Sequence, residues 1–224
     1  MSVWAVLAAA GRGERFGSDR PKAFARLGGR PLLAESLERL ESSDWIEFIV
    51  IAAPPEWEEP AILLAEELGA GKVSSVVTGG ASRSESVREA LAEVADDAAV
   101  VLVHDAARPL IPEDVIERVL APLSEGWDGV VPGFAPSDTI KRVEGDRVRE
   151  TLPRAELVAV QTPQAFVASV LREALAGDVG TASDCASLVE SRGGRVKVVE
   201  GDRRLLKVTS AEDLAVVEAW LSEQ

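Results

Sequence analysis

Residues 4–13 read Trp-Ala-Val-Leu-Ala-Ala-Ala-Gly-Arg-Gly, a short apolar run that ends in small residues and glycines. Six further apolar runs, rich in Val and Ile, follow along the chain at residues 46–53, 73–77, 100–103, 130–132, 157–160 and 196–199. These runs are apolar throughout instead of alternating with polar residues, which is typical of strands buried on both faces of a parallel sheet. The pattern therefore predicts that all of them belong to one such sheet.

Helical spacing occupies the segments between these runs. Apolar residues three and four positions apart mark one face of a helix each, and they fall at Leu33, Leu37 and Leu40, at Val87, Ala90, Leu91 and Val94, at Val115, Val119 and Leu123, and at Leu214, Val217 and Leu221. Strands that alternate with helices predict a doubly wound, mostly parallel α/β sandwich, in which ligands bind beyond the carboxyl ends of the strands. The 224 residues suit a single domain, residues 1–224.

One segment, residues 136–152, breaks this alternation. It shows period-two patterning around a Glu144-Gly145-Asp146 turn and is too polar for the core. We expect a projecting β-hairpin. Because an isolated hairpin is marginally stable in water, we expect this arm to pack against a second copy of the chain in a homodimer.

The composition excludes several classes of protein and partner. With 24 Lys and Arg against 38 Asp and Glu, the net charge of −14 disfavours binding to nucleic acid or to an anionic membrane through most of the surface. A single Cys185 forms no internal disulfide, and together with the single His104 it is too little for a His/Cys metal cluster. No apolar run approaches the roughly 18 residues of a membrane span, and the first run lacks the basic leader of a signal peptide, so we expect a cytoplasmic protein.

The loop after the first run carries a local excess of positive charge. Four cations lie within eleven positions, against only Glu14 and Asp19, and they are Arg12, Arg15, Arg20 and Lys22. Small residues with free backbone N–H groups beside such cations favour a polyphosphate site over a glycine turn with solvated charges. The Gly-x-Gly-x-x-x-Gly spacing fits neither a dinucleotide fingerprint nor a P-loop.

Two later strand ends carry further candidate residues. After the run at 73–77, Ser82 and Glu85 predict a helix capping box, and Ser86 either reads the edge of a base or belongs to the cap alone. After the run at 100–103, Asp105 is suited to a ribose hydroxyl or a divalent ion. We interpret the adjacent His104 as a structural, hydrogen-bonded histidine.

Taken together, the motifs identify a family. In order they are Ala-Ala-Ala-Gly-x-Gly-x-Arg with Pro-Lys, Gly-Gly-x-x-Arg-x-x-Ser-Val, Val-His-Asp-Ala-Ala-Arg-Pro, Asp-Thr-Ile-Lys, Gln-Thr-Pro-Gln and Leu-Lys-Val-Thr. Over essentially its whole length the chain resembles the 2-C-methyl-D-erythritol 4-phosphate cytidylyltransferases of the non-mevalonate isoprenoid pathway. The resemblance implies transfer of CMP from CTP to 2-C-methyl-D-erythritol 4-phosphate, with Mg²⁺ or another divalent cation, and a homodimer formed through the hairpin arm.

The resemblance also implies roles for individual residues. The cations expected to act in catalysis are Arg15, Lys22 and Lys207. The residues expected to bind the nucleotide are Ala9, Ala10, Gly11, Gly80, Ala81, Ser86, Asp105 and Ala106, and Asp105 is also the expected metal ligand. The residues expected to line the polyol phosphate pocket are Arg108, Thr139, Arg154, Thr162 and Ser183.

The chain departs from the family pattern at four of these or neighbouring positions. Ala81 and Cys185 stand where acidic residues are common, Ser183 stands where Thr is usual, and Leu205 stands where Asn often occurs. Two other functions stay open at this point. One is a pentitol- or pentulose-phosphate cytidylyltransferase, and the other is a nucleotide-binding scaffold without activity.

Overall fold

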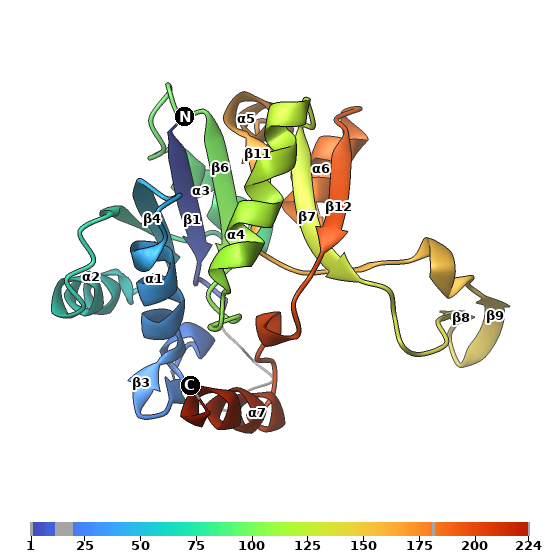
Figure 1. The fold of residues 1–224 in the computed structure, drawn as a ribbon, viewed down its shortest axis with the longest axis horizontal. Coiled ribbons are helices and arrows are strands. Elements are labelled where there is room, and N and C mark those ends of the chain that lie inside the picture. The colour runs from blue at the N-terminus through green and yellow to red at the C-terminus, as the bar shows by residue number, and fades with distance from the viewer. Residues whose placement is uncertain (1, 12–19, 181, 224) are drawn as a thin grey trace.

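The computed structural model describes residues 2–11, 20–180 and 182–223 of the chain. Its centre is an eight-stranded sheet covered by helices on both faces (Figure 1). The parallel half of this sheet consists of β1 (Val3–Ala8), β4 (Phe48–Ala53), β5 (Val73–Thr78) and β6 (Val100–Asp105). The other half consists of β7 (Gly129–Phe134), β10 (Ala159–Val160), β11 (Gln164–Val167) and β12 (Val196–Glu200).

Strand β1 lies in the middle and sets the register of the parallel half. It pairs in parallel with β4 on one side and with β6 on the other, so that Ala8 lies beside Asp105. Beyond β6, β11 runs antiparallel between β6 and β7, and β12 pairs in parallel with β7. The predicted doubly wound, mostly parallel architecture is therefore confirmed, with β10 and β11 as its antiparallel members.

Six of the seven predicted apolar runs are confirmed as strands, and four of these, β1, β4, β6 and β7, are almost entirely buried. The prediction is wrong for the run at 157–160, where only the short strand β10 forms, and this strand is antiparallel and exposed. Along β1, Ala5 and Leu7 face one hydrophobic core, whereas Trp4 and Val6 face a second core across the sheet. Strand β11 was not predicted from the sequence. It is only four residues long, and its first residue, Gln164, is buried although it is polar. The segment therefore lacks the continuous apolar run that marks the other strands.

Seven α-helices cover the two faces and one end of the sheet. They are α1 (Leu32–Ser42), α2 (Glu58–Glu67), α3 (Arg83–Leu91), α4 (Glu113–Leu120), α5 (Ala168–Leu175), α6 (Cys185–Ser191) and α7 (Ala211–Ser222), counted over the described residues. Short 3₁₀ turns complete them at η2 (Lys22–Phe24), η3 (Ala121–Glu125), η4 (Arg154–Glu156) and η5 (Arg203–Leu205). None of the described helices has the length and apolar character needed to cross a membrane.

Helix α7 lies apart from the two main cores, at the end of the molecule next to the small hairpin of β2 (Arg26–Leu27) and β3 (Arg30–Pro31) (Figure 1). Its contact with the body is a third, smaller hydrophobic cluster. Val217 is buried in this cluster, and Leu214 and Leu221 pack against it partly exposed. The predicted inner stripe of this helix is confirmed.

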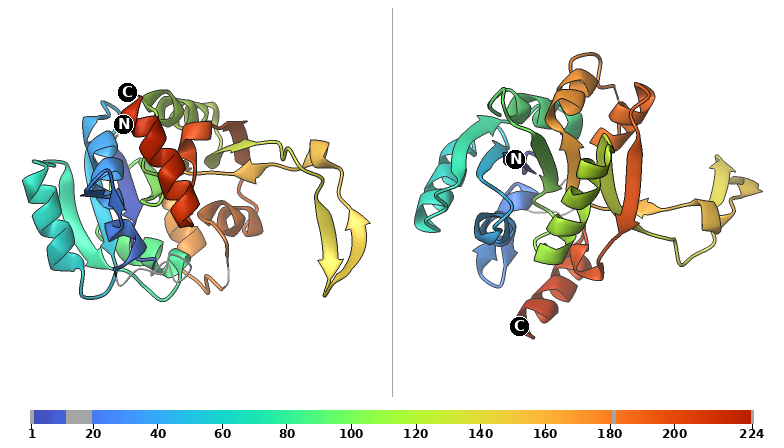
Figure 2. Two further views of the ribbon diagram at one scale, coloured as in Figure 1. Left: turned by 90° about the horizontal axis from the view of Figure 1, so that it is seen from below. Right: turned by 45° about the horizontal axis from the view of Figure 1, so that its top comes forward.

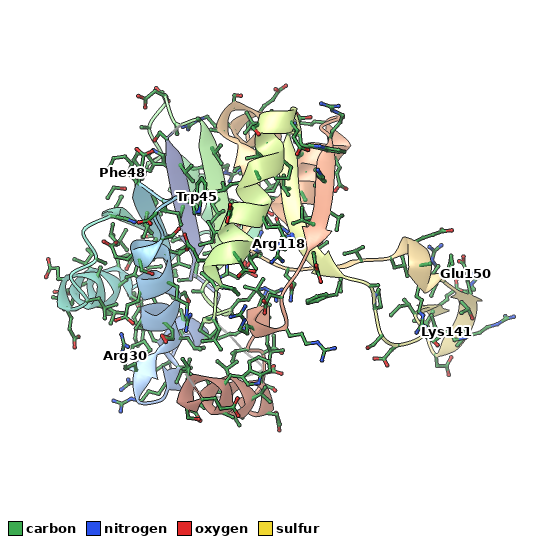
Figure 3. The ribbon with its side chains drawn as sticks, in the orientation of Figure 1. Arg30, Trp45, Phe48, Arg118, Lys141 and Glu150 are labelled. Atoms are coloured by element: carbon green, nitrogen blue, oxygen red, sulfur yellow. The ribbon has the colours of Figure 1, made fainter. Side chains whose placement is uncertain are left out.

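The expected hairpin is present and projects from the sheet. It consists of β8 (Lys141–Glu144) and β9 (Arg147–Thr151), and it stands away from the body in both views of Figure 2. Lys141 and Glu150, which are labelled in Figure 3, lie on this hairpin, far from the sheet. Val143 and Val148 are opposite one another in the hairpin register and are more than half exposed. Exposed valines on a separate hairpin are consistent with a partner surface.

One arginine joins two helices on the same face of the sheet. Arg172 of α5 donates hydrogen bonds to the carbonyl oxygens of Leu91, Val94 and Ala95, at distances of 3.2, 2.9 and 2.7 Å. These carbonyls lie at the carboxyl end of α3, where a helix leaves acceptors without intrahelical donors. A positive charge is also favourable at the negative end of the helix dipole.

We therefore expect Arg172→Met to lower the free energy of unfolding by about 1–3 kcal/mol, because partly buried acceptors lose a charged donor. Urea denaturation followed by circular dichroism measures this change. The control is Arg30→Met, which removes an exposed ion pair with Glu38 away from the arm and should change the free energy by less than about 0.5 kcal/mol. Equal effects of the two substitutions would contradict the role assigned to Arg172.

Candidate active site

A cleft of about 990 Å³ opens where the carboxyl ends of β1 and β6 meet the loop after β5. Ten of the residues expected from the sequence contribute to its lining: Ala9, Ala10, Gly11, Lys22, Gly80, Ala81, Ser86, Asp105, Ala106 and Lys207. The strand register brings these segments together, since Ala106 N donates to Ala8 O at 3.0 Å and Ala9 N to Ala52 O at 2.9 Å. All eight expected nucleotide-binding residues therefore border one cleft.

The wall of the cleft depends on a glycine. A Cβ atom on Gly79 would lie 2.2 Å from the Cβ of Ala10, so only glycine lets the loop after β5 approach the end of β1 so closely. At Gly11 the situation is the opposite, because a Cβ would meet nothing within 4 Å among the described residues. Nothing in the described part of the chain therefore covers Gly11 on this side.

The loop after β5 begins α3 with the predicted capping box, which is confirmed. Ser82 Oγ accepts from Glu85 N at 3.1 Å, and Ser82 N donates to Glu85 Oε2 at 2.9 Å. Ser86 Oγ donates to Ser82 O at 2.8 Å. A hydroxyl has one hydrogen, so the oxygen of Ser86 keeps its ability to accept a hydrogen bond. Its role at the edge of a base stays a prediction.

Asp105 is the electrostatic centre of the cleft. Its Oδ1 accepts from Arg83 Nε and its Oδ2 from Lys207 Nζ, both at 2.7 Å, and the residue is only 6% exposed. Burial alone would raise the pKa of this carboxyl, but the charges of Arg83 and Lys207 hold that pKa well below its usual range. Burial likewise disfavours the charge of Arg83, and the Asp105 carboxylate outweighs this and raises the guanidinium pKa. Both groups are ionised.

His104 is the structural histidine that we expected. Its Nε2 lies 2.9 Å from Arg108 O, and its Nδ1 lies 3.2 Å from Thr162 Oγ1, which also accepts from Asp105 N at 3.1 Å. We assign the ring proton to Nε2, because Thr162 Oγ1 already accepts from Asp105 and has its own hydrogen left for Nδ1. Burial lowers the pKa of His104 to about 4, so the ring is neutral near pH 7. The ring fixes the backbone at Asp105.

The remaining expected residues lie outside this cleft lining or outside the described residues. Arg15 belongs to the second group. Arg108 donates a hydrogen bond to the carbonyl oxygen of Leu205. The side chain of Leu205, which departs from the family pattern, is buried in the core, so that Leu205 contacts Arg108 through its backbone. Thr162 is used by the His104 network, and Ser183 is exposed just before α6.

Thr139 and Arg154 belong to the arm. Both are exposed, and Arg154 Nη1 donates to Ser137 O at 2.8 Å, which joins the two ends of the arm. The arm stands away from the body of its own chain (Figures 1 and 2), and none of its residues lines the cleft. Within one chain, therefore, these two residues are not brought to the other candidates.

Arg83 is the residue that sequence reasoning missed. It follows a helix N-cap, where a solvated cation is common, and the only signal was its fixed place in the Gly-Gly-x-x-Arg motif. Besides Asp105, it contacts the sulfur of Cys185, with Nη1 3.6 Å from Sγ. Burial raises the pKa of this thiol to about 11, so Cys185 is an uncharged neighbour of Arg83.

The donor set suits a divalent cation only if phosphates supply most of its ligands. Over residues 2–11, 20–180 and 182–223, no group of three or more His, Cys, Asp or Glu side chains is arranged to hold a metal. Asp105 supplies one carboxylate to the cleft, and each oxygen has a second lone pair beyond its present bond. One carboxylate together with substrate phosphates is a usual environment for Mg²⁺, so these residues fit a Mg²⁺ that arrives with a polyphosphate.

Comparison with known proteins gives a single result. The family model described as 2-C-methyl-D-erythritol 4-phosphate cytidylyltransferase (IspD) matches residues 3–223. The enzyme of that name from Frankia casuarinae is 46% identical over 98% of this chain and 81% of its own length. The one from Saccharopolyspora erythraea is 46% identical over 99% of this chain and 100% of its own length. The crystal structure of the Thermus thermophilus enzyme is similar at a TM-score of 0.79 and 34% identity, covering 97% of this chain and 98% of that one.

The buried His104 gives the protein a specific pH dependence. Its pKa of about 4 lies below the 6.5 of a free histidine, so as the pH falls the unfolded chain takes up a proton before the folded one does. Stability that is fully present above pH 6.5 should therefore decline toward pH 4, by about 3 kcal/mol from this group. Urea denaturation at a series of pH values measures the decline.

The control for this prediction is His104→Gln, which keeps a polar side chain but does not titrate. The variant should have a lower free energy of unfolding than the wild type at pH 7, and the difference between the two free energies should become smaller as the pH falls from 6.5 to 4. Two parallel curves across that interval would contradict a buried neutral His104. The carboxyl of Asp105 is present in both proteins, so the stability that its lowered pKa contributes, which is lost from about pH 5 downward, is common to both curves.

Proposed function

The chain belongs to the 2-C-methyl-D-erythritol 4-phosphate cytidylyltransferase family, and from this membership we propose that it transfers CMP from CTP to 2-C-methyl-D-erythritol 4-phosphate and releases pyrophosphate, a step of isoprenoid precursor synthesis. One observation carries the proposal. All eight expected nucleotide-binding residues border the same cleft as Lys22 and Lys207, in a chain whose net charge is −14. A cationic cleft in an acidic protein favours a polyanionic ligand.

The reaction needs positioning and charge neutralisation more than proton transfer. The second pKa of a phosphate monoester is about 6, so the attacking oxygen is already an anion near neutral pH. His104 is neutral, buried and hydrogen-bonded at both nitrogens, and Cys185 is a protonated thiol. Neither of them is needed as a base, and neither is available as one.

In the proposed mechanism, a phosphate oxygen of the polyol phosphate attacks the α-phosphorus of CTP. The bond from this phosphorus to the oxygen bridging to the β-phosphate breaks, and pyrophosphate leaves with that oxygen. Backbone N–H groups near Ala10 and Gly11 bind the triphosphate, while Lys22 and Arg15 neutralise the charge that builds up during transfer. Gly80, Ala81 and Ser86 hold the cytosine, and Asp105 and Ala106 the ribose.

Asp105 also fits as the protein ligand of Mg²⁺, which when bound would neutralise phosphate charge and help to orient the triphosphate. The protein's own part is to keep that carboxylate ionised and directed into the cleft. Arg83 and Lys207 do this through their bonds to Oδ1 and Oδ2.

The polyol phosphate pocket, as proposed, takes residues from two copies of the chain. Arg108, Thr162 and Ser183 come from the body, and Thr139 and Arg154 from the arm of a second copy. Support comes from the arm itself, which stands away from the body of its own chain and exposes Val143 and Val148. The active enzyme in this proposal is a homodimer.

A pyrophosphate-release assay tests the function directly. It crosses CTP, UTP, ATP and GTP with 2-C-methyl-D-erythritol 4-phosphate, a pentitol phosphate and a pentulose phosphate, in the presence of Mg²⁺. We expect turnover for CTP with the methylerythritol substrate. Preference for a pentitol or pentulose phosphate would reassign the substrate, and no release in any combination would favour a nucleotide-binding scaffold.

The assignment of Lys22 gives a kinetic prediction. Lys22→Ala should lower kcat by about 100-fold, the scale for the loss of one donor to developing charge. The matched control is Lys197→Ala, which removes a half-buried lysine of β12 that is paired with Glu125 and lies outside the cleft lining, and which should leave kcat unchanged. A Lys22→Ala variant with a raised KM and a wild-type kcat would show that Lys22 only binds the ground state.

The arm gives a prediction about assembly. The double variant Val143→Asp, Val148→Asp introduces two charges into the proposed dimer contact and should convert the dimer to a monomer in analytical ultracentrifugation, with loss of turnover. Circular dichroism should show an unchanged content of helix and strand, because both valines are exposed in the single chain. Val216→Asp, at an exposed valine of α7, is the control and should stay dimeric. A dimeric, active double variant would refute the exchange of arms.

A further inference from the structure

The two cations on Asp105 are held in different ways. Arg83 is the first residue of α3, directly after the N-cap serine of the capping box, and its side chain is 20% exposed. Lys207 lies in the irregular segment between η5 and α7, and its side chain is 40% exposed. The backbone of this segment is anchored beside Lys207, where Val208 N donates to Ala107 O at 2.8 Å. The lysine is therefore fixed at its backbone and more accessible at its amino group.

The chemistry of the two side chains adds to this difference. A guanidinium is a rigid fork, whereas an ammonium is a point charge on a flexible stem. Arg83 Nη2 is buried with no hydrogen-bond partner among the described residues, and its contact with Cys185 is to an uncharged thiol. Asp105 is thus the one charged group that the described part of the chain sets against Arg83.

A buried carboxylate needs a counter-ion at every stage of the reaction. Removing the last partner of a buried charge is strongly destabilising, because the charge is left without compensation. With two cations present, Asp105 can lose one and stay compensated by the other. The cation that leaves more easily is the one with the more exposed, more flexible side chain, which is Lys207.

We propose that Arg83 is the fixed counter-ion of Asp105 and Lys207 the exchangeable one, so that Asp105 holds Lys207 in the empty cleft and an incoming phosphate group takes Lys207 over. The inference rests on the proposed function, which brings phosphate groups into the cleft that Lys207 lines, and on the catalytic role that the family resemblance implies for Lys207. Arg83 is then a positioning residue, since it acts through Asp105 and Lys207. If Arg83 is removed, Lys207 can leave Asp105 only by leaving the buried carboxylate of Asp105 without a counter-ion.

The test compares Arg83→Met, which removes the charge, with Arg83→Lys, which keeps it. The matched control is Arg88→Met, because Arg88 is on the same helix and its nearest acid is the exposed Glu89 at 3.9 Å. We expect Arg83→Met to lower kcat/KM for the polyol phosphate by about tenfold or more, with the Kd of CTP, measured by calorimetry, changed by less than about threefold. Arg83→Lys should recover most of the loss, and Arg88→Met should behave as the wild type.

Three results would overturn the inference. The first is a wild-type kcat/KM in folded Arg83→Met. The second is a loss of CTP affinity as large as the loss of kcat/KM, which indicates general disruption of the cleft. The third is Arg83→Lys no better than Arg83→Met. If Arg83→Met does not fold, Arg83→Lys decides alone: unchanged CTP affinity and measurable turnover support the inference, and loss of both overturns it.

A second measurement separates this inference from the proposed function. If the wild type releases no pyrophosphate, the proposed function fails, and the difference between the two cations is then read from thermal unfolding without substrates. A fixed counter-ion contributes more to the folded state than an exchangeable one, so Arg83→Met should lower Tm more than Lys207→Met does. An equal or smaller decrease for Arg83→Met would refute the inference on this measurement as well.

Discussion

A buried carboxylate at the end of a central strand must be compensated by positive charge, and this requirement organises the whole cleft. Asp105 is the last residue of β6, and its counter-ions come from 22 residues earlier, at Arg83, and from 102 residues later, at Lys207. One carboxylate thereby ties together the loop after β5, the end of β6 and the segment before α7. The geometry of the cleft follows from where the charge of Asp105 is satisfied, since no regular hydrogen-bond ladder joins these three described segments.

The backbone beneath Asp105 is fixed by a second set of bonds that carries no charge. Thr162 Oγ1 accepts from Asp105 N, and His104 links Thr162 to the carbonyl of Arg108. A protonated His104 would place another cation beside Arg83 and Arg108, so the neutral ring, with its pKa of about 4, avoids that repulsion. The charged pairs hold the side chain of Asp105, and the uncharged network holds its main chain. Two independent constraints on one residue make its position well determined.

Much of this arrangement was predictable because it follows from burial and from local chemistry. Continuous apolar runs predicted strands that are buried on both faces, and Ser82 with Glu85 predicted a capping box. Asp105, which is an acid close after an apolar run, indicated a ligand site at the end of a strand. Strand β11 was not predictable in the same way, because the buried Gln164 replaces an apolar residue at its start. Arg83 was missed for a related reason: it begins helix α3, whereas its partner Asp105 ends strand β6, and a contact between distant segments leaves no local pattern. The arm was also predicted as a hairpin. Its packing partner, however, is proposed to be a second chain, and the fold of one chain does not determine that contact.

The net charge of −14 is compatible with a polyphosphate site because electrostatic interactions in water are short in range. At physiological ionic strength, exposed charges are screened over about 8 Å, so acids on distant helices have little effect in the cleft. Within the cleft, Lys22, Arg83 and Lys207 outnumber Asp105, the one acidic side chain among the described residues that line it. The excess is held by the fold before any ligand binds, so a phosphate group meets cations already in position and the protein does not have to gather them. Because Asp105 keeps two of these cations in place while cancelling part of their charge, it lets an empty cleft be stable and still attract an anion.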